Sequence, residues 1–312
     1  MEISFAGRVA IVTGGGRGIG RAHCLEFARR GAAVVVNDLT DPDRDGTNPA
    51  DEVVKEIQSA GGQAVACHDS VVTKDGSRRI VQTALDHFGT VDIIANNAGV
   101  MRNGYFEEIT PEKLDLVLDV NLRGSYFVTQ AAWATLRDKG YGRVIMTSSS
   151  GGLFSQHGMS NYAAAKAGVY GLAKAIAFEG RPHGINVNVV LPMAGHMHAM
   201  DPVPDAEKYY PPRLREKLEP LRRVEASTPM VAFLASENCN LTGEAFAAGF
   251  GRFARVFVGE SRGWVAPVLT ISAEDVAAHI ADVRELDGFA IPGNLFEELE
   301  LASTQLDLFT EA

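Results

Sequence analysis

Residues 8–20 read Arg-Val-Ala-Ile-Val-Thr-Gly-Gly-Gly-Arg-Gly-Ile-Gly. The first six residues form a short apolar, β-branched run, and a helical pattern follows the glycines as far as Arg30. A strand, a glycine turn and a helix in this order are typical of a dinucleotide site. Glycines at 14, 18 and 20 let the backbone approach a pyrophosphate, and the amides that open the helix at about residue 18 attract its charge. A tight turn without a ligand is the competing interpretation.

An acidic residue follows at the distance that such a site requires. Asp38 ends the next apolar run, 24 positions after Gly14. Its carboxylate would accept hydrogen bonds from the adenosine ribose hydroxyls and would repel a 2′-phosphate. Arg17 in the glycine turn and Arg44 beyond Asp38 favour the opposite choice, since either could pair with that phosphate. We give the carboxylate more weight, so the sequence favours NAD as cofactor over NADP.

Strand and helix patterns alternate for about 250 residues from this start. Alternation of this kind indicates a parallel sheet covered by helices on both faces, an α/β doubly wound, Rossmann-like fold with a C-terminal extension. The further strands are expected at residues 63–67, 91–95, 143–147, 185–191 and 244–249, and the helices at 51–60, 74–88, 111–138, 160–180 and 227–236.

We expect one domain followed by a tail. Residues 1–255 are the expected Rossmann-type dehydrogenase domain, and they include a substrate loop at 193–225, where the alternation breaks into a proline-rich stretch. Residues 256–312 form the extension, which we expect to pack on the domain or on a partner subunit. The sequence predicts a strand pair around 252–265, a helical segment near 273–285 and an acidic tail.

Composition excludes several classes of partner. The chain has 312 residues, of which 46% are hydrophobic, and this is ample to bury a core. A net charge of -10 and a pI near 5.3 disfavour nucleic acid and anionic membranes. No apolar run approaches the roughly 18 residues of a membrane span. Cys24, Cys67 and Cys239 lack metal-type spacing and, in a chain without a signal peptide, indicate reduced thiols and a cytoplasmic protein. We expect no metal site.

A tyrosine and a lysine four residues apart carry the expected chemistry. Tyr162 and Lys166 would lie on one face of a helix, where the ammonium favours the deprotonated phenol. Lowering a tyrosine pKa from about 10 to near 7 needs roughly 4 kcal/mol, which one close cation and a cationic nicotinamide could supply together. Such a tyrosine exchanges protons with an alcohol or ketone at neutral pH. The spacing alone also fits an exposed helical pair.

Five motifs together resemble the short-chain dehydrogenase/reductase family over about residues 6–250. They are Thr13-Gly14-x-x-x-Gly18-x-Gly20, Asn96-Asn97-Ala98-Gly99, Asn121, Ser149 and Tyr162-x-x-x-Lys166. The resemblance implies a catalytic tetrad. In it, Tyr162 is the general acid/base, Ser149 hydrogen-bonds the substrate oxygen, and Lys166 tunes the tyrosine and holds the nicotinamide ribose. Asn121 kinks its helix and anchors a water.

The same resemblance implies which residues hold the cofactor. Asp69 would meet the adenine, residues 96–99 would buttress the site, and Pro192 would begin the loop over the nicotinamide. The implied cofactor-binding residues are Gly14, Arg17, Gly18, Ile19, Gly20, Asp38, Asp69, Ser70, Asn97, Ala98, Gly99, Tyr162, Lys166, Pro192 and Ala194.

A closer likeness exists within the family. Residues 30–39, 122–125 and 141–149 are similar to the dehydrogenase domain of peroxisomal multifunctional β-oxidation enzymes. That likeness implies a (3R)-hydroxyacyl-CoA substrate, while other relatives imply a steroid or alicyclic alcohol. The family also implies a homodimer or homotetramer.

The expected function is NAD-dependent hydride transfer between a secondary alcohol and a ketone, on a small-molecule or acyl-CoA substrate. The alternatives are an NADP-preferring 3-oxoacyl reductase, a nucleotide-sugar epimerase or dehydratase, and a non-catalytic nucleotide-sensing module. Many family members place a glycine and then a threonine after the proline, but this chain has Pro192-Met193 and no Ser or Thr between 193 and 208. Its substrate pocket therefore differs from that of those family members. The residues expected to line it are Gly152, Leu153, Phe154, Met193, Met197 and Tyr209.

Overall fold

The computed structural model describes residues 2–39, 48–193, 201, 203–209, 211–266 and 270–307. The chain divides into two compact units, Met1–Arg255 and Val256–Ala312. The first unit carries the predicted nucleotide motifs, and the fold below is that of this unit unless the second is named.

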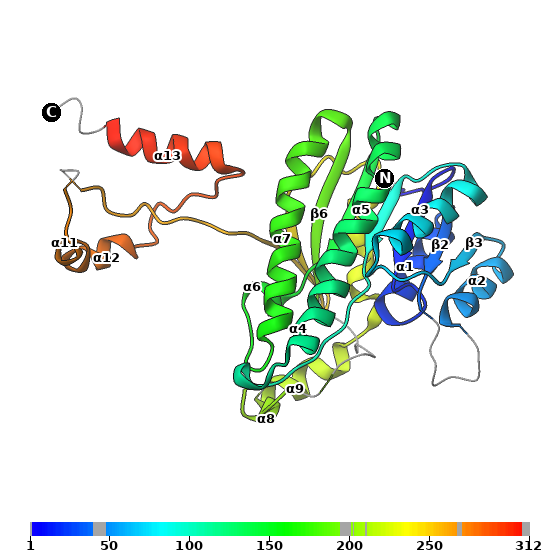
Figure 1. Cartoon of the computed structure of the whole chain (residues 1–312), viewed down its shortest axis with the longest axis horizontal. Coiled ribbons are helices and arrows are strands. Elements are labelled where there is room, and N and C mark those ends of the chain that lie inside the picture. The colour runs from blue at the N-terminus through cyan, green and yellow to red at the C-terminus, as the bar shows by residue number, and fades with distance from the viewer. Residues whose placement is uncertain are drawn as a thin grey trace. The chain divides into compact units, whose positions relative to one another are not determined.

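Eight strands of the described residues form one sheet in the order β3-β2-β1-β4-β5-β6-β7-β8 (Figure 1). Every pair from β3 to β7 is parallel, and the order reverses between β1 and β4, which confirms the doubly wound fold. The strands are β1 (Val9–Thr13), β2 (Ala33–Asn37), β3 (Gln63–Cys67), β4 (Ile93–Asn96), β5 (Gly142–Thr147), β6 (Ile185–Pro192), β7 (Ala245–Gly249) and β8 (Arg252–Val256).

Two groups of helices pack on the sheet. Helices α1, α2 and α10 belong to one group, and α3, α5 and α7 to the other, because the members of each group contact one another and the strands. The helices of the first unit are α1 (Gly18–Arg29), α2 (Pro49–Ser59), α3 (Lys74–Phe88), α4 (Pro111–Leu118), α5 (Gly124–Lys139), α6 (Ser150–Leu153), α7 (Ser160–Gly180), α8 (Ala206–Tyr209), α9 (Pro212–Leu218) and α10 (Thr228–Ala235).

Polar caps decide where several of these helices begin. The side chains of Asn48, Thr73 and Thr110 accept hydrogen bonds from backbone amides in the first turns of α2, α3 and α4. Helix α3 ends at Gly89, whose φ of 75° lies in the left-handed region that glycine adopts without strain. These signals lie in the sequence itself, which is why the predicted bounds of α3 match the observed ones.

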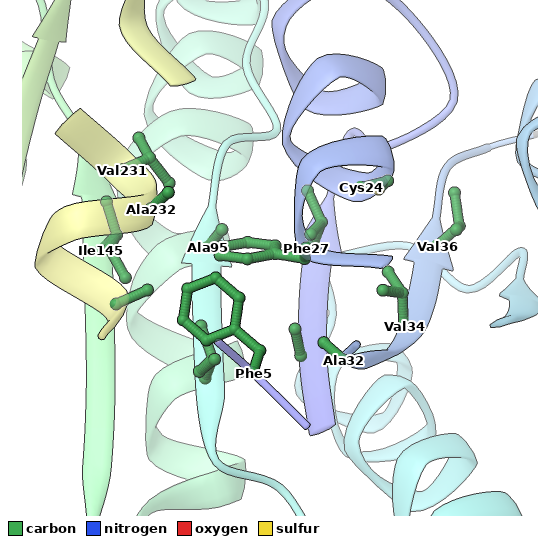
Figure 2. Close-up of a cluster of buried hydrophobic side chains, with 14 of the residues drawn as sticks. Phe5, Cys24, Phe27, Ala32, Val34, Val36, Ala95, Ile145, Val231 and Ala232 are labelled. Carbon is green, nitrogen blue, oxygen red and sulfur yellow. The ribbon is translucent and has the colours of Figure 1, made fainter. Parts of the chain in front are cut away.

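The main core lies between the sheet and the group of α1, α2 and α10 (Figure 2). Phe5 and Phe27 meet edge to face at its centre, with ring centroids 5.2 Å apart. All five residues of β1 are buried, as expected for a central parallel strand covered on both faces. The core therefore fixes β1, and with it the glycine turn that follows.

Three of the predicted elements are wrong in detail. The helix expected at 111–138 is two helices, α4 and α5, separated by a π-helical turn at Asp119–Arg123. The strand pair expected around 252–265 is the single strand β8, because Glu260 makes only an isolated bridge with Ala290. The segment 193–225, expected as a loop, contains the short helices α8 and α9.

The second unit contains three helices in its described part. They are α11 (Ala273–Ala278), α12 (Ile280–Val283) and α13 (Leu295–Asp307); the first two fall in the helical segment expected near 273–285, and the acidic tail contains α13. A capping box between Ser272 and Asp275 begins α11. Many of its large apolar side chains are exposed, among them Phe257, Phe289 and Phe296.

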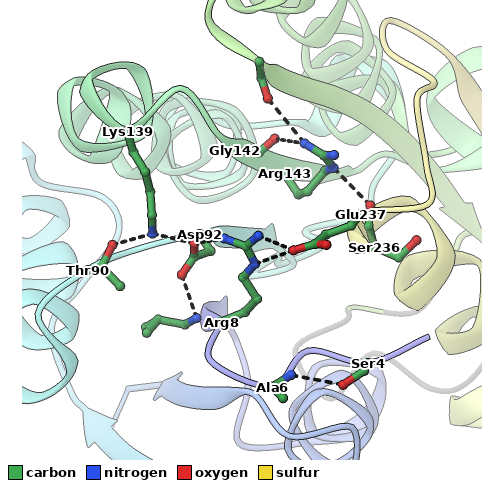
Figure 3. A network of polar contacts seen from close by, with 12 residues as sticks. Ser4, Ala6, Arg8, Thr90, Asp92, Lys139, Gly142, Arg143, Ser236 and Glu237 are labelled. Atoms are coloured by element: carbon green, nitrogen blue, oxygen red, sulfur yellow. Dashed lines mark hydrogen bonds and ion pairs between the residues drawn. The ribbon is translucent and has the colours of Figure 1, made fainter. Parts of the chain in front are cut away.

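A buried carboxylate ties together the amino-terminal ends of the strands (Figure 3). Asp92 is fully buried, accepts a hydrogen bond from the amide of Val9 at 2.9 Å, and pairs with both Arg8 and Lys139. Arg8 also pairs with Glu237. This network lies at the end of the sheet opposite the glycine turn, so it stabilises the fold without entering the site.

We expect Asp92→Asn to lower the free energy of unfolding by about 2 kcal/mol, measured by urea unfolding. Removing one partner of a fully buried pair costs roughly 3–5 kcal/mol, and this loss is smaller because Arg8 and Lys139 are partly exposed. Asp138→Asn, whose pair with Arg137 is exposed, is the matched control and should change stability by less than about 0.5 kcal/mol. Equal effects of the two variants would contradict this account.

Candidate active site

The glycine turn is held at the point where the strand order reverses. The hydroxyl of Thr13, at the end of β1, accepts hydrogen bonds from the amides of Asn97 and Ala98, which follow β4. The side-chain amide of Asn97 donates to the carbonyls of Thr13 and Gly14 at 3.1 Å. A Cβ at Gly14 would lie 2.9 Å from the Cα of Ala98, so only glycine allows the approach. A crevice at such a reversal is where α/β sheets bind ligands.

Two further glycines fit the backbone closely. A Cβ at Gly20 would lie 2.0 Å from the carbonyl oxygen of Gly14, and one at Gly16 would lie 2.8 Å from the Asp38 carboxylate. The amide of Gly16 donates to that carboxylate at 2.9 Å. The turn and the acidic residue are therefore positioned together, with Asp38 at one end of the crevice.

One cleft of about 1010 Å³ brings the predicted residues together. Pro192 lies on its wall, whereas Asn121 is not part of the lining, although its neighbour Val120 is. Ala194 lies outside the described residues. The other predicted site residues that line the cleft are Gly14, Arg17, Gly18, Ile19, Gly20, Asp38, Asp69, Ser70, Asn97, Ala98, Gly99, Ser149, Tyr162 and Lys166.

Helix α7 carries the tyrosine and the lysine into the cleft. Tyr162 and Lys166 are 5% and 3% exposed, so the interpretation as an exposed helical pair is wrong. The Lys166 ammonium lies 5.8 Å from the centre of the tyrosine ring and donates to the carbonyl of Thr147 at 2.7 Å. The hydroxyl of Ser148 donates to the Lys166 carbonyl at 2.7 Å, which fastens α7 to the end of β5.

Burial shifts the pKa of each group in the direction that favours its neutral form. It lowers the pKa of Lys166 from 10.5 to about 7. It also raises the pKa of Tyr162, and a hydrogen bond with Ser149 opposes this rise. The sequence predicts that a close cation and a bound nicotinamide together lower the tyrosine pKa; in the protein alone the pKa is raised, because desolvation of the phenol outweighs the other contributions.

Asn121 lies in the π-helical turn between α4 and α5. Its side-chain amide donates to the carbonyls of Val100 and Val117 at 2.8 and 2.9 Å, and its amide oxygen is buried without a protein partner among the described residues. The helix is irregular here, as expected for a residue that kinks it. Single π turns of this kind occur frequently at functional sites.

Asp69 follows β3 and lines the same cleft as Asp38. Its carboxylate accepts a hydrogen bond from Arg79 at 2.6 Å, and its backbone carbonyl accepts one from Asn37 at 2.9 Å. The two contacts position this carboxylate at the edge of the sheet.

The substrate half of the cleft was only partly foreseen. Met193 and Tyr209 line it as expected, and Met197 lies outside the described residues. The expectation for Gly152, Leu153 and Phe154 is wrong: none lines the cleft, because α6 packs on α7 there and Phe154 is 69% exposed. Arg222, a basic residue that could meet an anionic substrate, lines the cleft, and the lining residues that the sequence did not reveal include Met101, Met159, Arg215, Leu218 and Phe250.

Contacts across the cleft hold Tyr209. Its ring lies 4.5 Å from that of His157, which in turn meets Tyr105. The hydroxyl of Tyr105 donates to Asp205 at 3.0 Å. His157 is thus part of an aromatic contact. Among the residues that the structure describes, no cluster of His, Cys, Asp or Glu could hold a metal ion, and no helix is long and apolar enough to cross a membrane.

Residues 8–204 match the short chain dehydrogenase family. The chain belongs to this family. It is 42% identical over 292 residues to a short-chain type dehydrogenase/reductase of Mycobacterium tuberculosis, covering 92% of this chain and 97% of the other. It is also 42% identical over 252 residues to the peroxisomal multifunctional enzyme type 2 of Mus musculus, covering 80% of this chain and 32% of that enzyme.

Solved structures agree with this assignment. The full-length peroxisomal multifunctional enzyme type 2 of Drosophila melanogaster has a TM-score of 0.79 at 32% identity, covering 99% of this dehydrogenase but 50% of that chain. A short chain dehydrogenase from Mycobacterium avium has a TM-score of 0.74 at 32% identity, covering 90% and 97%. This dehydrogenase thus spans about a third of the Mus musculus enzyme and half of the Drosophila melanogaster enzyme.

Lys166→Met should stabilise this dehydrogenase, and more so at pH 7 than at pH 9. The pKa of Lys166 is about 7 in the folded protein and 10.5 in the unfolded chain. Between these two pH values Lys166 is therefore protonated in the unfolded chain and mostly neutral in the folded protein. Wild-type stability therefore rises with pH across this window, by up to about 1 kcal/mol per pH unit relative to the variant. Urea unfolding at both pH values measures the difference.

Lys174→Met, on the same helix, is the control for loss of a lysine charge. A Lys166→Met protein whose advantage over the wild type is the same at pH 7 and pH 9 would contradict a depressed lysine pKa.

Proposed function

We propose that this dehydrogenase interconverts a secondary alcohol and a ketone with NAD, on a 3-hydroxyacyl-CoA substrate. One observation carries the proposal. A single cleft is lined by the carboxylate of Asp38 beside the glycine turn and by Ser149, Tyr162 and Lys166, of which Tyr162 and Lys166 are buried. A dinucleotide fits this arrangement, since the glycine turn suits a pyrophosphate and the carboxylate suits ribose hydroxyls.

A nicotinamide held in this cleft would supply the chemistry of hydride transfer, and this chain's own residues handle the proton. Tyr162 takes the proton from the alcohol at its phenol oxygen, or returns it in the reverse direction. Ser149, which hydrogen-bonds Tyr162, holds the substrate oxygen in place. The ammonium of Lys166 lies near the face of the Tyr162 ring. The buried amide oxygen of Asn121 is a hydrogen-bond acceptor on the path by which the proton leaves.

Charge in the substrate half supports an acyl-CoA. Residues 211–223 contain five basic and two acidic side chains, although the whole chain has a net charge of -10. Arg215 and Arg222 of this segment line the cleft beside Leu218 and Tyr209. Arginines next to apolar surface suit a ligand with phosphates and an acyl chain. The names of several relatives, peroxisomal multifunctional enzymes and hydratase-dehydrogenase-epimerases, point the same way.

Other substrates remain as outcomes of the test. A steroid or other alicyclic alcohol would use the same chemistry without phosphate contacts. An NADP-preferring 3-oxoacyl reductase would use Arg17 for the 2′-phosphate, and a nucleotide-sugar epimerase or dehydratase would show no net NADH formation.

NADH formation at pH 8–9 should be measured with (3R)-hydroxyacyl-CoA esters, 17β-hydroxysteroids and cyclic alcohols, with NADP in parallel. We expect the thioesters to be oxidised with NAD. Tyr162→Phe should bind NAD normally and lose at least about two orders of magnitude in turnover, the usual scale for a positioned acid/base. Turnover of free alcohols alone would reject the acyl-CoA substrate, and a fully active Tyr162→Phe enzyme would reject the mechanism.

Asp38→Ala should weaken NAD binding and raise relative activity with NADP. The variant removes the ribose partner and the negative charge that repels a 2′-phosphate, and a gain of about tenfold in the NADP to NAD ratio of kcat/KM corresponds to about 1.4 kcal/mol. Asp51→Ala, on the exposed side of α2, is the matched control. An unchanged ratio would assign cofactor choice to Arg17 or to the loop after Asp38.

A homodimer or homotetramer also belongs to this proposal, and the exposed apolar side chains of residues 256–312 support it. The cytoplasmic location stays a prediction from the sequence.

A further inference from the structure

The turn between β7 and β8 has an unusual residue in a demanding position. Phe250 and Gly251 alone connect Gly249, the last residue of β7, to Arg252, the first of β8. Both have positive φ, 55° and 75°, as a type I′ turn requires. Such turns favour Asn, Asp or Gly at the first of these positions, and a bulky side chain there is strained.

The strain at Phe250 stands apart from the other cases. Among the described residues, Ser155 and Asp205 are the other non-glycine residues with positive φ. Both have short polar side chains, and Asp in particular tolerates this conformation. Phe250 is the apolar one. Strained backbone that persists in a folded protein is concentrated at ligand sites.

Packing at the end of β7 fixes the backbone that leads into the turn. The amide of Met193 donates to the carbonyl of Ala248 at 2.8 Å, which extends the pairing of β6 with β7. A Cβ at Gly249 would lie 2.4 Å from the carbonyl oxygen of Met193, so glycine alone fits there. Phe250 follows directly, and it lines the cleft together with Met193 and Tyr162.

We propose that Phe250 selects the substrate: the strained turn holds its ring in the cleft as the surface on which the apolar part of the alcohol or ketone packs. This inference rests on the proposed function. The turn alone would favour Asn at this position. The turn therefore does not need an aromatic ring, and we assign the ring to contact with the ligand.

The variants separate the ring from the turn. Phe250→Asn supplies a side chain that the turn favours and removes the ring, while Phe250→Tyr keeps the ring. Phe253→Asn makes the same chemical change on β8 at an exposed residue outside the cleft lining, and is the control. Each protein is assayed with NAD and (3R)-hydroxyacyl-CoA esters whose acyl chains run from four to sixteen carbons, and its melting temperature is recorded.

Phe250→Asn should lose about tenfold or more in kcat/KM on the longer esters, mainly through KM, and stay within about twofold on the four-carbon ester. Its melting temperature should equal or exceed that of the wild type, since the strain is relieved. Phe250→Tyr and Phe253→Asn should keep the wild-type chain-length profile.

Three results would overturn the inference. An unchanged profile in Phe250→Asn would show that the substrate does not touch the ring. An equal loss on all esters with a lower melting temperature would show that the ring is only structural. A wild-type protein that oxidises none of the esters would reject the proposed substrate and this inference with it, which distinguishes the two failures.

Discussion

The contact between the end of β1 and the end of β4 is the constraint on which the rest of the site depends. Thr13, Asn97 and Ala98 exchange hydrogen bonds there, and Gly14 comes too close to Ala98 for any side chain. Buried strands on both sides hold this contact in place. Because the strand order reverses at the same point, the helices that follow β1 and β4 diverge and leave the crevice open. The nucleotide half is therefore a direct consequence of topology.

The buried groups on the Tyr162 and Lys166 side of the cleft lower the stability of the fold. Lys166 is buried on α7, where its ammonium donates to the carbonyl of Thr147, and burial lowers its pKa to about 7. A buried cation without a counter-charge destabilises a fold, and proteins keep such groups mainly where chemistry needs them. Tyr162 is subject to the same desolvation, which raises its pKa. The two groups share one environment, in which a further charge near the phenol would have a large effect because little water screens it.

The residues that the sequence predicts around the glycine turn line the cleft, whereas many lining residues on its other side were not predicted. Gly14, Gly20 and Asp38 follow from local rules, since a strand, a turn and a helix at fixed spacing determine where they lie. Helix α3 was bounded correctly because Thr73 and Gly89 are local signals. Asn121 is a different case: the family resemblance implies that it kinks its helix, but periodicity over residues 111–138 shows one helix, and the π turn includes a tertiary contact with Val100 that no periodicity shows. The raised tyrosine pKa of the protein alone was missed for a similar reason, because burial cannot be seen in an i, i+4 spacing.

Residues that break local rules mark where the substrate half is specified. Helix α9 presents Arg215 to the cleft, although the sequence predicts a loop there, and only the fold shows which side chains face inward. Phe250 occupies a turn position suited to Asn, so its local preference and its place in the cleft disagree. In the nucleotide half, by contrast, local preference and global position agree at every glycine. A family can thus keep one cofactor site while it changes substrates, because the residues that face the substrate are those that the common fold does not dictate.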